Sequence, residues 1–244
     1  MNSNLLALST LLAIVGCTSP TVEENILVSD ARDVHNINEN ALKYNVASDS
    51  SYIMWIGSKP AGKHEGTIAV KSATVALEND SIVGGKIVFD INSIKSTDLV
   101  DNMERFDRLI NHLKSNDFFD AANFPEAAFE ITEVISYDSS FILDSKEEFE
   151  SEFTPLSAEE FVVKNPTHSV TGNLTMRDST LSITFPAKII MWNNALMVAA
   201  RFNLDRTNWN LKYRDEGSVG DKTKDWFIYN TVNISFNLEF VKEE

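Results

Sequence analysis

The segment 226–240 alternates apolar and polar side chains with a period of two residues. One parity holds Ile228, Val232, Ile234, Phe236, Leu238 and Phe240, and the other holds Thr231, Asn233, Ser235, Asn237 and Glu239. Successive side chains of a β-strand point to opposite faces, so this order predicts a strand with one apolar face and one solvated face. A chain with so strict an alternation is expected to build a sheet over an apolar interior.

The same period recurs along the chain from Tyr44 onward. It is clear over 181–189 and 198–204, and further strands are expected near 51–58, 66–78, 81–92, 126–137 and 168–177. Turns are expected at Asn79-Asp80, Gly84-Gly85 and Asp178-Ser179. This recurring pattern predicts one all-β domain.

One segment changes its period to that of a helix. A single stripe is formed by Leu99, Met103, Phe106, Leu109, Ile110 and Leu113. Thr97 or Asp98 is expected to cap the start of this helix. A lone helix beside about eight strands can bury its stripe over the open end of a barrel or against the barrel interior. The sequence therefore predicts an eight-stranded antiparallel β-barrel with one amphipathic helix across it.

The amino-terminal segment follows different composition rules from the rest of the chain. Residues 1–16 carry no charge, and the apolar run 5–15 has the length of a signal-peptide core, shorter than the roughly 20 residues that span a bilayer. The run ends at Gly16-Cys17, which resembles a bacterial lipobox, where the signal is removed before the cysteine and lipid is attached to its thiol. Cys17 is the only cysteine. We therefore expect a lipoprotein signal peptide over 1–16 and lipid attachment at Cys17, the alternative being a buried free thiol.

The remaining chain divides into a spacer and the domain. Residues 17–42 mix polar and acidic residues with single apolar ones and are expected to form a flexible tether, followed by the barrel domain over 43–244. The segment 138–160 is strongly acidic and is expected to be an exposed insertion, with or without a short helix. Lys and Arg number 21 and Asp and Glu 36, a net charge of −15, which argues against nucleic acid as a partner.

Sequence motifs for catalysis or metal binding are absent. The chain has no GxSxG, HExxH, Walker or GxGxxG motif, and no histidine lies three or four residues from another histidine or a cysteine. We therefore assign no catalytic residue, metal or cofactor and expect the protein not to be an enzyme. A serine triad assembled in space stays open as an alternative.

Five segments occur in an order that resembles the YceI-like family. They are IMWIGSKPAGKHEGTI (53–68), GGKIVFDINSI (84–94), HLKSNDFFDAANFPEAAFEIT (112–132), VTGNLTMRDSTLSITFPA (170–187) and FNLDRTNWNLKY (202–213). The resemblance covers about Tyr44 to Phe240. It implies a lipocalin-like barrel that binds a long amphiphilic chain, such as a polyisoprenoid or a fatty-acid-like lipid, and that often forms a homodimer.

The resemblance also implies where a ligand would bind. The residues expected near the cavity are Trp55, Phe89, Phe106, Leu109, Leu113, Phe118 and Phe119. Those suited to a head group or to the cavity mouth are Lys63, His64, Asp205 and Arg206. For each aromatic residue plain core packing is the alternative, and for the pair Asp205-Arg206 it is a salt bridge or a turn.

Together these features predict a carrier or storage protein of the bacterial cell envelope, anchored through Cys17 and facing the periplasm. Two other functions stay open. One is a structural or interaction lipoprotein whose barrel is filled by side chains and whose loops bind an envelope partner. The other is a hydrolase or isomerase acting on a lipid, which would need a polar cluster inside the pocket.

Overall fold

A computed structural model describes residues 21–24, 26–47, 51–138, 144–220 and 227–243. The expected signal peptide, Cys17 and Trp226 lie outside the described residues. No helix in the described part of the chain is long and apolar enough to cross a membrane.

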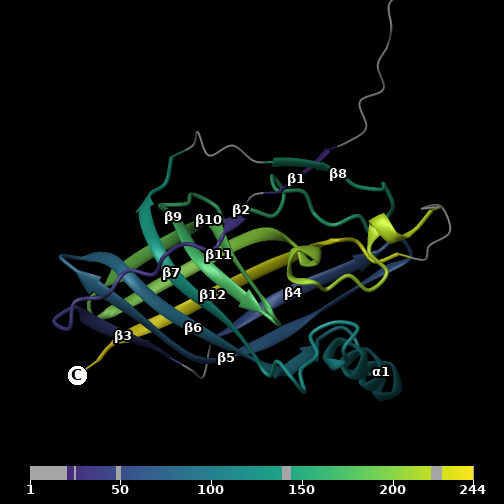
Figure 1. The fold of residues 1–244 in the computed structure, drawn as a ribbon, viewed down its shortest axis with the longest axis horizontal. Helices are drawn as coiled ribbons and strands as arrows, with labels where there is room; N and C mark the ends of the chain where they lie inside the picture. Colours follow the sequence, from purple (N-terminus) through teal and green to yellow (C-terminus); the bar gives the residue numbers. More distant parts are fainter. Residues whose placement is uncertain (1–20, 25, 48–50, 139–143, 221–226, 244) are drawn as a thin grey trace, which may run out of the picture.

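Antiparallel strands make up most of the molecule (Figure 1). The strands are β1 (Thr21–Glu24), β2 (Leu27–Asp30), β3 (Leu42–Val46), β4 (Tyr52–Lys59), β5 (Gly62–Glu78), β6 (Ser81–Ser96), β7 (Glu126–Ser136), β8 (Asp144–Glu147), β9 (His168–Met176), β10 (Ser179–Trp192), β11 (Ala195–Asp205) and β12 (Thr231–Lys242). β1 and β8 form a two-stranded sheet, and the other strands form one ten-stranded sheet.

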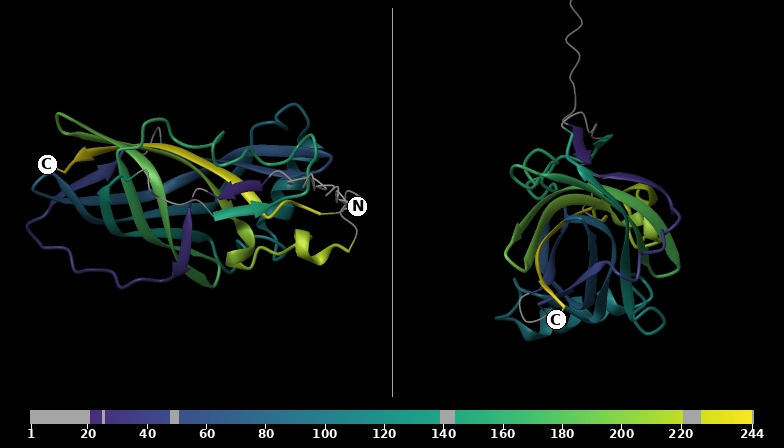
Figure 2. Two further views of the ribbon diagram at one scale, coloured as in Figure 1. Left: turned by 90° about the horizontal axis from the view of Figure 1, so that it is seen from above. Right: turned by 90° about the vertical axis from the view of Figure 1, so that its left-hand side faces the viewer.

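The large sheet closes into a barrel because β11 pairs with β12 (Figure 2). β3 and β4 share one position between β5 and β12, with β3 pairing at one end of these neighbours and β4 at the other. β2 lies off the path around the barrel. The other nine strands of this sheet therefore occupy eight positions around the axis, and the prediction of an eight-stranded antiparallel barrel is confirmed.

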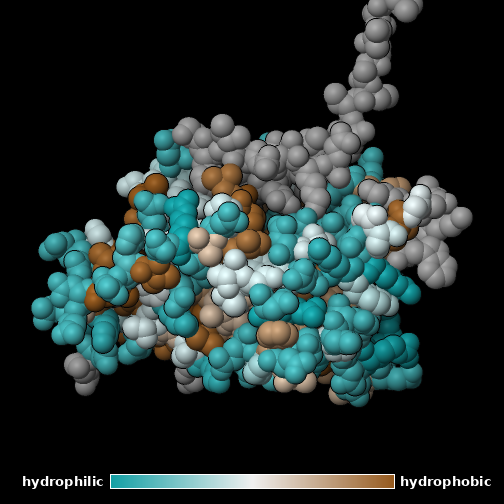
Figure 3. Space-filling view, in the orientation of Figure 1, coloured by the Kyte–Doolittle hydropathy of each residue, from teal (hydrophilic) through white to brown (hydrophobic). Residues whose placement is uncertain are grey.

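Alternation along each strand separates the interior from the surface. Val232, Ile234 and Phe236 of β12 face the interior, as their parity predicts. The outer surface is mostly hydrophilic on the face drawn in Figure 3. β12 begins at Thr231 and not at residue 226, because the backbone N–H groups of Ile228 and Tyr229 donate to the carbonyl of Arg214 in a neighbouring loop and to that of Ser58 near the end of β4.

Turn chemistry connects the strands as expected at two of three places. Asn79 and Asp80 have positive φ angles of 48° and 61° between β5 and β6, and Arg177, at 52°, precedes Asp178 between β9 and β10. Gly84-Gly85 was expected at a turn but lies inside β6. A side chain at position 85 would place its Cβ 2.6 Å from the Thr74 carbonyl oxygen, so close strand packing explains this glycine.

The helix α1 spans Met103–Lys114 and lies across one end of the barrel (Figure 1). It starts at Asn102, whose side chain accepts a hydrogen bond from the Arg105 N–H at 3.1 Å, and so neither Thr97 nor Asp98 is the cap. Asp98 instead accepts hydrogen bonds from the Glu65 N–H and the Ser96 hydroxyl. Leu99 is buried, but it lies in the turn before the helix.

Residues 26–41, here called the N-terminal strap, cross the outside of the barrel. Ile26 is 1% exposed, and β2 pairs with residues 181–184 of β10. The next contact is with β9, where the Asn173 side chain accepts from the Arg32 N–H and donates to the Arg32 carbonyl. This part of the expected flexible tether therefore packs on the barrel.

The strap is held in place because β10 and β11 separate along part of their length. The two strands pair over 187–192 and 195–200, and the earlier half of β10 pairs with β2 on that edge. Without β2, the backbone N–H and C=O groups on this edge of β10 would face solvent unpaired. β2 thus completes the wall of the barrel at this seam.

The acidic segment 138–160 is partly packed rather than wholly exposed. β8 lies within it, and its described part otherwise contains turns, without the short helix that was one expectation. Leu156 accepts hydrogen bonds through its carbonyl from Asn203 and Asn233, which are 0% and 1% exposed on the outer face of β11 and β12. The loop 148–163 therefore covers polar side chains that the alternation assigned to a solvated face.

Candidate ligand-binding site

The barrel encloses a cavity of about 290 Å³ whose walls are almost entirely apolar. Inward-facing side chains of the barrel strands line it, among them Ile53, Ile87, Phe129, Val170, Phe185, Phe202 and Leu238. Its few polar wall residues cluster in the β4–β5 hairpin, on α1 and on the short 3₁₀ helix η2 (Arg206–Trp209). We call this the α1 end of the barrel. The opposite end, near the β5–β6 and β10–β11 hairpins, is lined by Ile82, Val134, Ile189 and Phe240.

Six of the seven apolar residues expected near the cavity line it in the structure. They are Trp55, Phe89, Leu109, Leu113, Phe118 and Phe119. Phe106 is the exception, because it packs on the cluster that contains Trp55 and Ile110 without reaching the cavity wall. Whether these walls hold a ligand stays a prediction.

The four polar residues expected at the mouth separate into two pairs. His64 and Arg206 line the cavity. Lys63 does not, because it alternates with His64 along β5 and is exposed outside the barrel. Asp205 caps η2 and accepts hydrogen bonds from the Thr207 N–H and hydroxyl at 2.9 and 2.6 Å, which agrees with the turn interpretation.

Arg206 is a buried cation that organises the chain at the α1 end. Its guanidinium donates to the carbonyls of Leu211, Tyr213, Ile228 and Tyr229. Its Cζ also lies 5.9 Å from the centre of the Phe118 ring. Burial lowers the pKa of Arg206 to about 10, with nearby acidic charges opposing the shift, so the side chain stays charged at neutral pH.

His64 is held by a carboxylate at the rim of the cavity. Its Nδ1 lies 2.7 Å from Oδ2 of Asp98. Partial burial opposes ionisation of Asp98, but hydrogen bonds from His64, the Glu65 N–H and Ser96 outweigh it and hold the pKa of this carboxyl below its ordinary value. The Ser96 hydroxyl donates to the other oxygen of the same carboxylate, Asp98 Oδ1, at 2.8 Å.

Two ionisable wall residues, Lys59 and His112, were not predicted from the sequence. Lys59 has the same strand parity as Trp55, and it ends β4 at the rim. His112 lies on the helical stripe beside Leu109 and Leu113, with its Nε2 3.0 Å from Asp117 Oδ2 and its ring 4.6 Å from that of Tyr213. Both residues lie within the quoted motifs. Strand parity for Lys59 and helical spacing for His112 would have predicted that they face the cavity.

Two glycines allow aromatic rings to pack closely against neighbouring strands. A Cβ at Gly66 would lie 2.6 Å from a ring carbon of Trp55, and a Cβ at Gly172 would lie 2.4 Å from the Phe129 ring. A side chain at either position would overlap the ring, so glycine is needed for the ring to pack against the neighbouring strand. Among the described residues, no group of three or more His, Cys, Asp or Glu side chains could hold a metal ion.

Comparison with known proteins agrees with this fold. A family model for the YceI-like domain matches residues 44–240. The crystal structure of BcnA from Burkholderia cenocepacia superposes with a TM-score of 0.52 at 17% identity, covering 80% of this chain and 98% of that chain. A polyisoprenoid-binding domain from Saccharophagus degradans, implicated in plant cell wall breakdown, superposes with a TM-score of 0.51 at 14% identity, covering 82% of this chain and 98% of that chain.

No curated protein matches the chain by sequence. The two structural similarities, both at low identity, show the shared barrel. The family model covers most of the chain, from Tyr44 within β3 to Phe240 within β12. On that match the chain belongs to the YceI-like domain family.

Proposed function

We propose that the protein binds one long apolar chain of an amphiphilic lipid, such as a polyisoprenoid or a fatty acid, and holds or carries it in the cell envelope. The observation that supports this most directly is the apolar cavity of about 290 Å³ inside a closed barrel. Small-molecule sites are typically concave, mostly apolar and about 300–1,000 Å³ in volume. A barrel filled by its own side chains would leave few voids larger than a water molecule.

Burial of the chain would supply the affinity. Each CH₂ taken from water contributes about 0.8 kcal/mol, so a sixteen-carbon chain gains on the order of 10 kcal/mol before the cost of ordering it. Such binding needs no chemical step. The polar wall residues at the α1 end would lie beside the polar end of the lipid.

Native mass spectrometry tests this function. The protein is purified from a bacterial host, delipidated in organic solvent, refolded, and offered hexadecanoic acid or geranylgeranyl phosphate. We expect co-purified lipid before extraction and one bound probe per barrel after it. Protein that never carries lipid and takes up neither probe would refute lipid binding.

We further propose that lipid on Cys17 anchors the protein to a bacterial membrane, facing the periplasm. The support is the uncharged segment 1–16 and the lipobox-like Gly16-Cys17. Two or more acyl chains anchor a protein stably, whereas one does not. Cys17→Ser is expected to move the protein from the membrane fraction to the soluble fraction, and unchanged membrane retention would contradict the anchor. A homodimer stays a prediction of the resemblance.

A further inference from the structure

We propose that the ligand carries an oxyanion head, either a carboxylate or a phosphate, that binds at the α1 end of the cavity between Lys59, His64 and His112 and accepts a hydrogen bond from the Trp55 indole. This rests on the proposed lipid-binding function and adds the chemistry of the head group. Three observations carry it.

The ionisable side chains on the cavity wall are all basic. They are Lys59, His64, His112 and Arg206, and no Asp or Glu is among the described residues that line the cavity. The whole chain has the opposite bias, with 36 acidic against 21 basic residues. A wall of one sign at one end of an apolar cavity favours a ligand group of the other sign.

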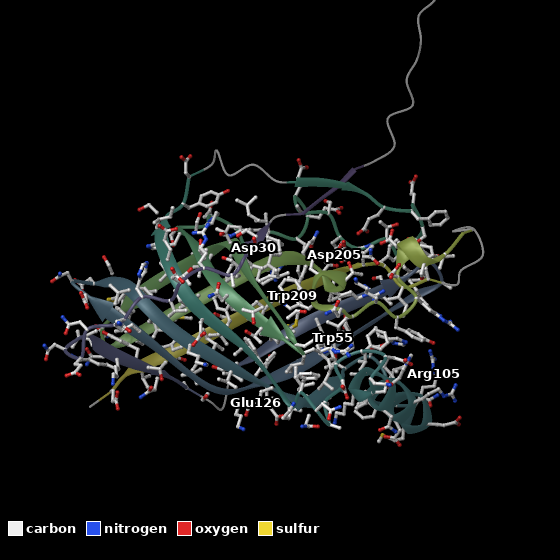
Figure 4. All side chains as sticks on the ribbon, in the orientation of Figure 1. Asp30, Trp55, Arg105, Glu126, Asp205 and Trp209 are labelled. Atoms are coloured by element: carbon white, nitrogen blue, oxygen red, sulfur yellow. The ribbon has the colours of Figure 1, made fainter. Side chains whose placement is uncertain are left out.

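The second observation is an indole N–H without an acceptor. Trp55 is 8% exposed and lines the cavity, and its Nε1 has no hydrogen-bond partner among the described residues. By contrast, Nε1 of the buried Trp209 donates to the Leu174 carbonyl at 2.9 Å. Leaving a buried donor unpaired costs about 1–3 kcal/mol, so an oxygen atom on the ligand would satisfy it. Trp55 lies in the barrel wall near α1 (Figure 4).

The third observation is that both histidines are oriented by carboxylates. His64 meets Asp98 through Nδ1, and His112 meets Asp117 through Nε2. One ring nitrogen is thereby fixed, and the other can donate to an anion when the ring is protonated. Arg206 contributes charge rather than new hydrogen bonds, because its guanidinium already donates to four backbone carbonyls.

The β4–β5 hairpin supplies a matched pair of lysines for the test. Lys59 and Lys63 are both exposed, but only Lys59 lines the cavity. Lys59→Gln and Lys63→Gln therefore remove the same charge from the inside and the outside of one rim. Neither substitution touches the packed interior, so both variants should fold.

The experiment measures dissociation constants for delipidated full-length protein by calorimetry, with two pairs of probes. Hexadecanoic acid is compared with hexadecan-1-ol, and geranylgeranyl phosphate with geranylgeraniol, so that each pair shares a chain and differs in head charge. We expect each anion to bind at least about 10-fold more tightly than its alcohol, since hydrogen bonds to charged groups are stronger than neutral ones. A larger preference for one anion identifies the head as phosphate or carboxylate.

The variants locate the effect. Lys59→Gln should weaken anion binding by about 3-fold or more and leave alcohol binding unchanged, while Lys63→Gln should change neither. Trp55→Phe keeps an aromatic ring and removes the donor, so it should weaken anion binding by about 10-fold. Trp192→Phe is its control, because Trp192 is 70% exposed and does not line the cavity.

The outcomes separate the two proposals. Equal affinity for acid and alcohol, or equal effects of the two lysine substitutions, would overturn the oxyanion head while leaving lipid binding intact. Failure of all four probes to bind wild-type protein would refute the proposed function itself. If Trp55→Phe does not fold, the lysine pair still decides.

Discussion

Arg206 and Asp205 are adjacent in the chain, but their side chains stabilise different parts of the α1 end. Asp205 caps η2, whereas Arg206 reaches across to four backbone carbonyls. Those carbonyls belong to residues between 211 and 229. Local sequence spacing cannot predict which backbone groups of a loop will lie beside the Arg206 side chain.

At the same scale, Asp98 is expected to make stability depend on acid. Its pKa is below the ordinary value in the folded protein, so its stabilising contribution is present above that ordinary value of 3.8 and is lost as pH falls through the folded pKa. Asp98→Asn should lower the free energy of unfolding by about 1–2 kcal/mol at pH 7 and reduce its decline below pH 4. Urea unfolding at several pH values between 2 and 7 measures both effects.

Asp101→Asn is the control for this prediction. Asp101 is an exposed neighbour in the same connection to α1. Two results would contradict the prediction: an equal loss of stability in both variants, or an unchanged decline of the free energy of unfolding below pH 4 in Asp98→Asn. Either would mean that the hydrogen bonds of Asp98 to β5 do not stabilise the protein.

Among the elements, the N-terminal strap is one that differs from what the sequence predicted. β2 has four residues, too few for a period of two to stand out from a polar segment. Its place depends on the separation of β10 from β11, which arises from pairing far along the chain. Composition predicted a tether, and long-range pairing decided otherwise.

Ile26→Ala is expected to destabilise the barrel by about 3 kcal/mol, because it removes a side chain that is 1% exposed in the core. Leu27→Ala, one residue later and 45% exposed, should change stability by less than about 0.5 kcal/mol. Equilibrium unfolding in urea compares the two variants. Similar small effects at both positions would mean that the strap does not contribute to the fold.

The loop 148–163 gives a second prediction about an element. Asn233→Ala removes the acceptor of the Leu156 N–H and one of the donors to the Leu156 carbonyl. It should lower the free energy of unfolding by about 1–3 kcal/mol, because a buried backbone group is left unpaired. Asn237→Ala, on the same face of β12 but exposed, should be nearly neutral. Thermal unfolding followed by circular dichroism distinguishes them, and a neutral Asn233→Ala would place the loop off the barrel.

For the whole molecule, the architecture could be predicted and the cavity could not. Period-two alternation and a single helical stripe were sufficient for a closed barrel with one helix across it, because few other arrangements bury those faces. The volume left inside depends on how Trp55 and Phe129 sit against Gly66 and Gly172. Such packing is a property of three dimensions that alternation does not encode.

A ligand inside the barrel should stabilise the whole molecule. At a free concentration of 100 times the dissociation constant, hexadecanoic acid is expected to add about 2.7 kcal/mol, which corresponds to a rise in Tm of about 5–10 °C for a domain of this size. Differential scanning calorimetry of delipidated protein with increasing acid measures the shift. An unchanged Tm under saturating conditions would contradict binding to the folded barrel.

The position of β2 has a mechanical consequence. Of the described strands, β1 and β2 lie nearest the amino terminus, and each joins the rest of the molecule through a short antiparallel pairing, β1 with β8 and β2 with β10. Tension applied at the amino terminus is therefore carried by four-residue pairings before it reaches the long strands that enclose the cavity. The pairing of β2 with β10 is short, so it should break before the longer pairings of β5, β6 and β12. Loss of β2 would leave the edge of β10 uncovered where β10 and β11 are separated, while the longer strands kept their register.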